Sequence, residues 1–183
     1  LYTTHKVVPP GLTAMNAQEV RTQLAQKKVA MILGSGWTPP IVNALNPDLK
    51  AFEVLKAAPA PYKREQATAI WLSSWIMSPN TKHPDEAWEL IKFITSKDIE
   101  LKWFIDNRVT SSRQDVSGVA PEILNDKFAS VLASQLPYGK VEPQITQWPE
   151  IMDVFTTSLQ EAIVGMKSPE DALAEAHERI NAI

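Results

Sequence analysis

Apolar residues recur along this chain in two patterns, one at helical spacing and one in short continuous runs. The helical spacing predicts helices over 16–28, 84–107 (two helices), 121–136, 149–165 and the residues after 168. Short β-prone runs predict strands over 29–33, 52–55 and 69–77. Helices interspersed with short strands indicate the α/β fold class.

Local signals at helix starts support these assignments. Asn16 is a suitable N-cap, Pro84 suits a first helical position, and Ser96 can cap the helix that follows. Ser168-Pro-Glu-Asp resembles a capping box that opens the last helix. The Pro39-Pro40 pair predicts a turn or the start of a short helix.

The most informative segment is 29–37, Val-Ala-Met-Ile-Leu-Gly-Ser-Gly-Trp. A buried strand would end in a small-residue loop made by Gly34, Ser35 and Gly36, which lets a ligand approach the backbone closely. Trp37 would then offer a flat stacking surface with one N–H donor. This arrangement is typical of a binding cleft at a sheet edge, and the alternative is a core tryptophan beside a turn.

Composition excludes several functional classes. The chain has 183 residues, no cysteine and a net charge of -3, so we expect neither disulfides nor thiol chemistry nor a nucleic-acid partner. Its three histidines are far apart, and the Gly34-Ser-Gly36 loop lacks the residues of a phosphate or dinucleotide motif. We therefore expect no metal and no cofactor. No apolar run is long enough to span a membrane.

The acidic residues give little support for catalysis. The pairs Asp85-Glu86 and Glu170-Asp171 lie at predicted helix starts, where the helix dipole accounts for them. The loop acids Asp115, Glu142 and Glu150 keep open the alternative of a glycan-active hydrolase with an aromatic-lined cleft. A helical interaction module is the third alternative.

Tryptophan is abundant, with six residues in the chain. Trp75 continues the strand predicted over 69–77, and a core position is expected for it. Trp88 and Trp103 lie in helical patterns and are also predicted to be core residues.

Four segments resemble bacterial extracytoplasmic solute-binding proteins, the carbohydrate-type (family 1) receptors of ATP-binding-cassette importers that include maltose-binding protein. The segment 28–37 resembles the family pattern G-K-A-A-M-x-x-x-G-x-W, and 78–96 resembles S-K-N-S-K-H-P-E-A-A-W-E-F-L-K-F-L-T-S. Ser111-Ser-Arg113-Gln-Asp-Val resembles P-S-R-x-x-V. Trp148-Pro-Glu-Ile and 162–180 resemble the closing W-x-x-I and the final S-P-E-E-A-L helix. The four segments occur in the family's order.

The resemblance implies the type II fold of periplasmic binding proteins, two α/β lobes with the ligand between them. It covers only the C-terminal half, so we expect a fragment whose first lobe is mostly missing. Residues 1–72 and 117–183 would form the C-terminal lobe, and 73–116 would cross the hinge and carry helices that pack on the first lobe. The apolar faces of 84–107 would then be uncovered, which predicts self-association of the fragment.

The resemblance also implies a function and a location. The chain would bind a solute, most simply a sugar, for delivery to the membrane permease subunits of an importer, and it would catalyse no reaction. The location would be periplasmic or extracellular, with or without an anchor supplied by a missing N-terminal segment. The family's Gly-Gly pair is replaced here by Trp71-Leu72, and the Pro before Ser-Arg by Ser111, so the solute stays open.

The candidate ligand-binding residues come from five places in the chain. Trp37 is the stacking candidate. Ser73 and Ser74 lie at the inferred hinge and could donate to hydroxyl groups, and Arg113 could make a forked contact or a salt bridge. The full set of candidate residues is Ser35, Gly36, Trp37, Ser73, Ser74, Arg113, Gln144 and Trp148.

Overall fold

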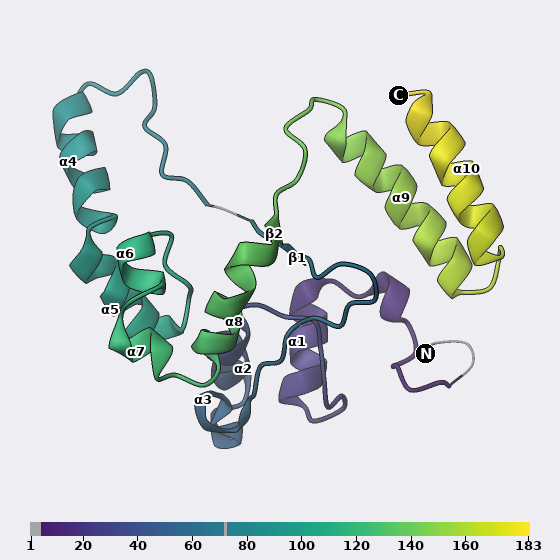
Figure 1. The fold of residues 1–183 in the computed structure, drawn as a ribbon, viewed down its shortest axis with the longest axis horizontal. Helices are drawn as coiled ribbons and strands as arrows, with labels where there is room; N and C mark the ends of the chain where they lie inside the picture. Colours follow the sequence, from purple (N-terminus) through teal and green to yellow (C-terminus); the bar gives the residue numbers. More distant parts are fainter. Residues whose placement is uncertain (1–4, 72) are drawn as a thin grey trace. The chain divides into compact units, whose positions relative to one another are not determined.

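The computed structural model describes residues 5–71 and 73–183 and is mostly helical, with one small parallel sheet (Figure 1). Leu72, where the first predicted lobe segment ends, lies outside the described residues, as do residues 1–4. The helices are η1 Leu12–Ala14, α1 Ala17–Ala25, α2 Thr38–Leu45, η2 Pro47–Leu49, α3 Ala51–Val54, α4 Pro84–Ile94, α5 Lys97–Asn107, α6 Gln114–Ser117, α7 Pro121–Leu124, α8 Ala129–Gln135, η3 Leu136–Tyr138, α9 Trp148–Ile163 and α10 Pro169–Asn181. The strands are β1 Thr68–Ala69 and β2 Gly139–Lys140.

The chain divides into two compact units. The first unit joins the N-terminal residues up to Gln23 with Glu142–Ile183, and the second is Leu24–Val141. The division differs in its boundaries from the lobe and hinge segments that the family resemblance implies. Those segments therefore stay a prediction.

The first unit is built on the helical hairpin of α9 and α10 (Figure 1). Ala172 and Ala176, four residues apart on α10, are buried, as are Val154 and Ser158 of α9. Small side chains at this spacing let two helices pack closely. Lys167 in the turn binds Glu161 at 2.9 Å and Glu175 at 2.6 Å, which joins the two helices at their connection.

The second unit contains two small apolar cores. One is formed by α5, α6, α7 and α8 around Phe104, Val116 and Ile123. The other joins the end of α1 to α2 and α3 through Leu24, Val42 and Ala51 and the neighbouring residues. These two cores hold the segments that frame the candidate site.

The sheet is short. β1 pairs in parallel with β2, and Thr68 lies opposite Gly139 and Ala69 opposite Lys140. A Cβ atom at residue 139 would collide with the end of the Ile70 side chain, so a larger residue would force that side chain to move. The sheet lies within the second unit.

Most predicted helices are confirmed, and the caps Asn16 and Ser168 act as expected, whereas Ser96 precedes α5 without a capping hydrogen bond from its side chain. The Asn16 side chain accepts hydrogen bonds from the N–H groups of Gln18 and Glu19 at 2.9 and 3.0 Å. Ser168 accepts one from Asp171 at 3.1 Å. Pro39 and Pro40 lie in the first turn of α2, where their missing N–H groups cost nothing.

The predicted strands are largely wrong. Residues 29–33 form no strand and pair with no other segment, and Met31 and Leu33 are 88% and 86% exposed. Residues 52–54 lie in the single helical turn α3, and among the described residues of 69–77 only Ala69 lies in a strand. A strand needs a neighbour for its backbone groups, and within the described ranges only β1 and β2 pair. The helix predicted over 121–136 is divided into α7 and α8.

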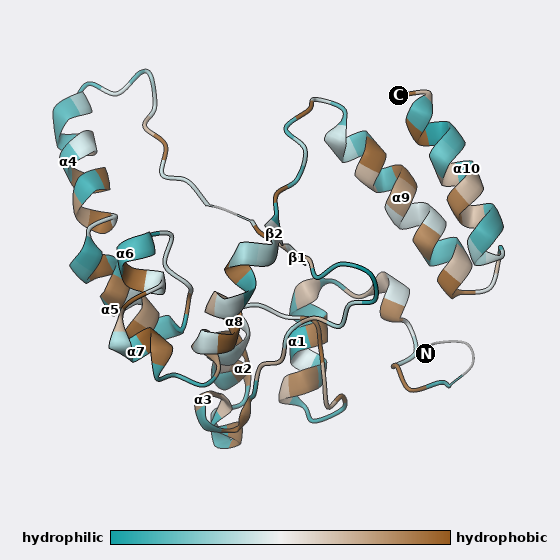
Figure 2. Cartoon of the chain, in the orientation of Figure 1, coloured by the Kyte–Doolittle hydropathy of each residue, from teal (hydrophilic) through white to brown (hydrophobic). Residues whose placement is uncertain are grey.

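Apolar residues occur along the helices throughout the chain (Figure 2), and many large apolar side chains are exposed to solvent. On α4 and α5 the exposed ones include Trp88, Leu90, Phe93, Trp103 and Ile105. The prediction that Trp88 and Trp103 are core residues is therefore wrong for this structure, and so is the same prediction for Trp75, which is also exposed.

Candidate functional site

The loop before α2 is held by local hydrogen bonds and one close backbone contact. Ser35 accepts a hydrogen bond from the Thr38 N–H at 3.0 Å, and its own N–H donates to Thr38 Oγ1 at 3.2 Å. Gly36 is buried against the end of α5, where a Cβ atom would lie 2.7 Å from the carbonyl oxygen of Arg108. The sequence therefore needs glycine at this position for close packing.

Trp37 follows this glycine at the start of α2 and is 44% exposed. Its indole meets that of Trp103 on α5 at 6.4 Å between ring centroids, with an angle of 86° between the ring planes. Trp103 is 46% exposed. The structure thus places two accessible indoles together, and sequence reasoning had predicted only the first as part of a site.

Arg108 connects the segments around this indole pair. Its backbone adopts a left-handed conformation with φ of 59° at the end of α5. Its guanidinium lies 5.5 Å from the ring centre of Phe52 and 5.7 Å from that of Phe104, and Nε binds Asp126 at 2.6 Å. Sequence reasoning missed Arg108, because two of its partners, Phe52 and Asp126, lie far from it in the chain.

Arg113 forms a separate cluster. Its guanidinium makes a forked contact with both carboxylate oxygens of Asp115, at 2.8 and 3.0 Å, and donates to the Thr95 carbonyl at 3.3 Å. The hydrogen bonds between the two side chains raise the pKa of Arg113 and lower that of Asp115. The donor groups proposed for a ligand therefore already bind protein atoms.

The serines before Arg113 are held by Glu100 of α5. Its carboxylate accepts hydrogen bonds from the Ser111 hydroxyl at 2.7 Å and from the Ser112 N–H at 3.2 Å. Ser111 Oγ in turn accepts the Arg113 N–H at 3.0 Å. The motif that resembles P-S-R thus anchors its loop to α5.

The other candidates lie elsewhere. Ser73 and Ser74 are exposed in an irregular segment of the second unit. Gln144 and Trp148 belong to the first unit, where the Gln144 amide donates to the Glu142 carbonyl at 3.1 Å. Trp148 opens α9, and its Nε1 is buried with no hydrogen-bond partner among the described residues. The ligand-binding roles of these residues stay predictions.

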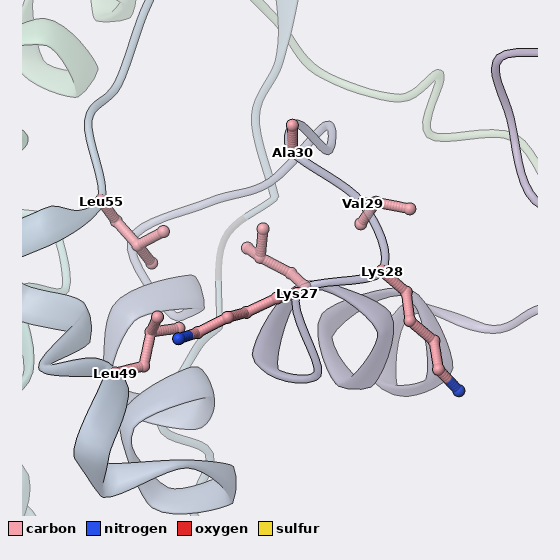
Figure 3. A pocket seen from close by; sticks show the side chains of 7 residues that line it. Lys27, Lys28, Val29, Ala30, Leu49 and Leu55 are labelled. Atoms are coloured by element: carbon pink, nitrogen blue, oxygen red, sulfur yellow. The ribbon is translucent and has the colours of Figure 1, made fainter.

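A separate hollow of about 450 Å³ lies at the end of α1 (Figure 3). Aliphatic side chains dominate its lining, together with two lysines. The residues that line it are Leu24, Lys27, Lys28, Val29, Ala30, Leu49 and Leu55. None of the predicted ligand-binding residues lines this hollow.

Neither a membrane-spanning helix nor a metal-binding cluster occurs in the described part of the chain. Within 5–71 and 73–183, every helix is too short or too polar to cross a lipid bilayer. In those ranges, histidines and carboxylates nowhere gather in a group of three that could hold a metal ion.

Residues 5–129 match the sequence profile of the family described as bacterial extracellular solute-binding protein, and the chain belongs to this family. Proteins of Brucella abortus and Brucella suis, provisionally named as binding proteins, are each 26% identical over 174 residues. That alignment covers 95% of this chain and 42% of each relative. The chain therefore spans less than half the length of the curated relatives it matches.

Two solved structures share the fold. A solute-binding protein of an ABC transporter from Thermotoga lettingae, bound to α-D-tagatose, gives a TM-score of 0.76 at 27% identity, over 92% of this chain and 42% of that one. A cyclo/maltodextrin-binding protein in complex with maltotetraose gives 0.70 at 23% identity, over 91% and 42%. The predicted family and fold class, part of a periplasmic-binding-protein fold, are confirmed. The family and both neighbours are binding proteins rather than enzymes.

Proposed function

We propose that this chain carries part of the ligand-binding surface of a receptor that binds a sugar outside the cytoplasm and delivers it to the permease subunits of an ATP-binding-cassette importer. Membership of the extracellular solute-binding family supports the class. The similar Thermotoga lettingae protein, bound to α-D-tagatose, supports a carbohydrate as the solute.

The observation that carries the proposal is the exposed indole of Trp37 on a closely packed loop. The C–H face of a sugar ring buries apolar area against an aromatic ring, while its hydroxyl groups stay at the rim in water. Ser35 and Gly36 place their backbone groups next to Trp37, where a ligand could contact them. Arg113 would then support the loop at the end of α5 rather than hold the ligand.

The proposed mechanism is closure of two lobes on the ligand. Residues 1–72 and 117–183 would belong to one lobe, and 73–116, with Ser73 and Ser74, would cross the hinge. A ligand shifts such an equilibrium only by binding the closed state more tightly than the open state. Gln144 and Trp148, the first residue of α9, stay predicted ligand-binding residues of the first unit. The location would be the periplasm or the cell exterior.

A hydrolase is a weaker explanation of the same surface. Its general acid must stay protonated near neutral pH, which requires a raised pKa. The pKa of Asp115, one of the loop acids considered for this role, is instead lowered by Arg113. The lowered pKa argues against Asp115 as a general acid, and we propose binding without catalysis because the family consists of binding proteins.

Ligand-observed NMR on the 183-residue chain tests the proposal. Saturation-transfer difference spectra would be recorded with D-tagatose, D-glucose and D-galactose, because one lobe surface is expected to bind weakly. A dissociation constant of about 1 mM corresponds to about 4 kcal/mol, which this experiment detects. We expect transfer to the ring C–H protons of at least one sugar.

Trp37→Ala should abolish the transfer, and Trp88→Ala, which removes another exposed indole on α4, is the matched control. Equal transfer in wild type and Trp37→Ala would contradict the role of Trp37. Absence of transfer from every sugar would contradict carbohydrate binding by this chain.

A further inference from the structure

We propose that residues 57–66, which connect α3 to β1, are a site of proteolytic cleavage, and that an endopeptidase selective for basic residues cuts after Lys63 or Arg64. The reaction adds water across one peptide bond. It leaves a new carboxylate on the basic residue and a new amino group on the residue that follows. Sugar binding plays no part in this reaction, so the site is independent of the proposed function.

The backbone of this segment lacks the hydrogen bonds that protect a chain from proteases. Residues 57–66 lie outside every helix and strand (Figure 1). Among the described residues, their N–H and carbonyl groups form no hydrogen bond with other backbone groups. A partner that binds an extended peptide pairs with its backbone groups, which must therefore be unpaired beforehand. The 57–66 segment meets this requirement without the unfolding of a helix or a core.

The basic side chains of the segment are accessible as well. Every residue from 61 to 65 is exposed, and Tyr62, directly before the basic pair, is 63% exposed. Within the described ranges, Lys63 and Arg64 form neither an ion pair nor a hydrogen bond through their side chains. An endopeptidase of this class binds a basic side chain in a pocket that contains a carboxylate. Either residue can enter such a pocket without leaving another partner.

Two side-chain contacts hold the end of the segment that leads to β1. The Glu65 carboxylate lies 3.5 Å from the Lys140 ammonium group, and the Gln66 amide donates to Gln135 at 3.0 Å. Both Glu65 and Lys140 are exposed, and ion pairs of this kind contribute little to stability. These contacts therefore oppose the binding of a protease only weakly.

The other dibasic pair of the chain, Lys27 and Lys28, is less accessible to a protease. Leu24 and Ala25, shortly before this pair, are only 8% and 2% exposed and belong to the core that joins α1 to α2 and α3. A cut after Lys28 would require the end of α1 to leave that core. Buried neighbours thus protect this pair, whereas the neighbours of Lys63 and Arg64 lie in water.

Single basic residues elsewhere are protected by helices or by ion pairs. Lys82 is exposed, but α4 begins at Pro84, so a protease that cut after Lys82 would have to open the first turn of that helix. Arg113 binds Asp115, and Lys167 binds two glutamates. The 57–66 segment therefore combines free basic side chains with a free backbone on both sides of the bond.

The contacts across the cut indicate that the two pieces stay together. Trp37 packs against Trp103, and Phe52 lies under the guanidinium of Arg108. Each of these contacts joins a residue before the cut to a residue after it. Neither contact depends on residues 57–66, so we expect the cleaved chain to remain one folded particle.

Limited digestion of the 183-residue chain with trypsin tests the proposal. Samples taken over time would be analysed by mass spectrometry of the intact pieces. We expect the first products to end at Lys63 or Arg64 and to begin at the residue that follows. Cleavage at the other basic residues should come later, because it requires local or global opening of the fold.

A double variant and a matched control measure the contribution of the basic pair. Lys63→Gln with Arg64→Gln should lower the initial cleavage rate by at least about 10-fold, because the remaining sites must open first. Lys27→Gln with Lys28→Gln removes the same charge from the other dibasic pair and should leave the rate unchanged. Circular dichroism checks that both variants are folded, and the fragment masses of the wild type answer the question if they are not.

Each outcome supports or overturns the proposal. A first cut of the wild-type chain outside 57–66, or an initial rate that Lys63→Gln with Arg64→Gln does not change, overturns the cleavage site. Gel filtration of the cleaved wild type should give the elution volume of the intact chain. Two separate peaks of smaller size would overturn the expectation that the pieces stay together.

Discussion

Gly36 lies directly against the carbonyl oxygen of Arg108, close enough that a Cβ atom on residue 36 would approach it to 2.7 Å. This contact joins the loop that ends in Trp37 to the end of α5. Gly36, the glycine of the motif that resembles the family, therefore packs the loop against α5. It would also leave room for a ligand, as the sequence suggested.

Gly36→Ala should destabilise the chain by about 1–3 kcal/mol, because the added methyl group must displace backbone rather than a flexible side chain. Urea unfolding followed by circular dichroism measures the change. Gly118→Ala is the matched control, since its Cβ would meet the Gln114 carbonyl at an ordinary 3.4 Å. Equal losses in the two variants would contradict the packing argument.

Arg108→Ala should lower the free energy of unfolding by about 2 kcal/mol, which lies between the values typical of exposed and of buried ion pairs. The variant removes the contacts with two phenyl rings and leaves the half-buried Asp126 carboxylate without this partner. Arg108→Lys keeps the charge and should lose less stability. Thermal unfolding measures both variants, and a larger loss in Arg108→Lys would disprove the role of the charge.

Asp115→Asn should lower the free energy of unfolding at neutral pH. The difference between the variant and the wild type should disappear at low pH. The hydrogen bond from Arg113 lowers the folded-state pKa of Asp115 below its ordinary value of 3.8. Stability from this pair is thus present above pH 3.8 and is lost as the pH falls through the folded-state pKa. Urea unfolding between pH 7 and acid measures it.

Asp153→Asn, an exposed aspartate of α9, controls for the loss of one negative charge in that series. A difference between Asp115→Asn and wild type that stays constant over the whole pH range would contradict the role of the ion pair. Since both partners are exposed to solvent, added salt should shrink the difference as well.

The exposed apolar residues of α4 and α5 should make the chain self-associate. Trp88, Leu90 and Phe93 lie on α4 with much of their surface in water, and apolar patches of this kind promote association. Sedimentation velocity should show a mass that rises with concentration, and Trp88→Gln with Leu90→Gln should reduce the rise. A mass independent of concentration in the wild-type chain would disprove this expectation.

Much of the helical structure could be predicted from the sequence because its signals are local. Asn16, Pro84 and Ser168 mark helix starts through contacts within one turn, and the structure confirms all three starts. The family resemblance was also carried by short segments, each recognisable without knowing its neighbours. Trp37 was found in this way, as an aromatic residue after a small-residue loop.

The strand assignments and the contact of Trp103 with Trp37 could not be predicted from the sequence, because they depend on tertiary structure. Residues 29–33 have the composition of a strand, but a strand exists only where another segment pairs with its backbone. The exposure of Trp103 depends on which face of α5 packs against Phe104's core, and its contact with Trp37 depends on Arg108 meeting Gly36. Sequence alone determined the helix starts after Asn16, at Pro84 and after Ser168, and the family, because these signals lie in residues that are close together in the chain. The tertiary structure decided which aromatic rings meet, because that contact joins segments far apart in the chain.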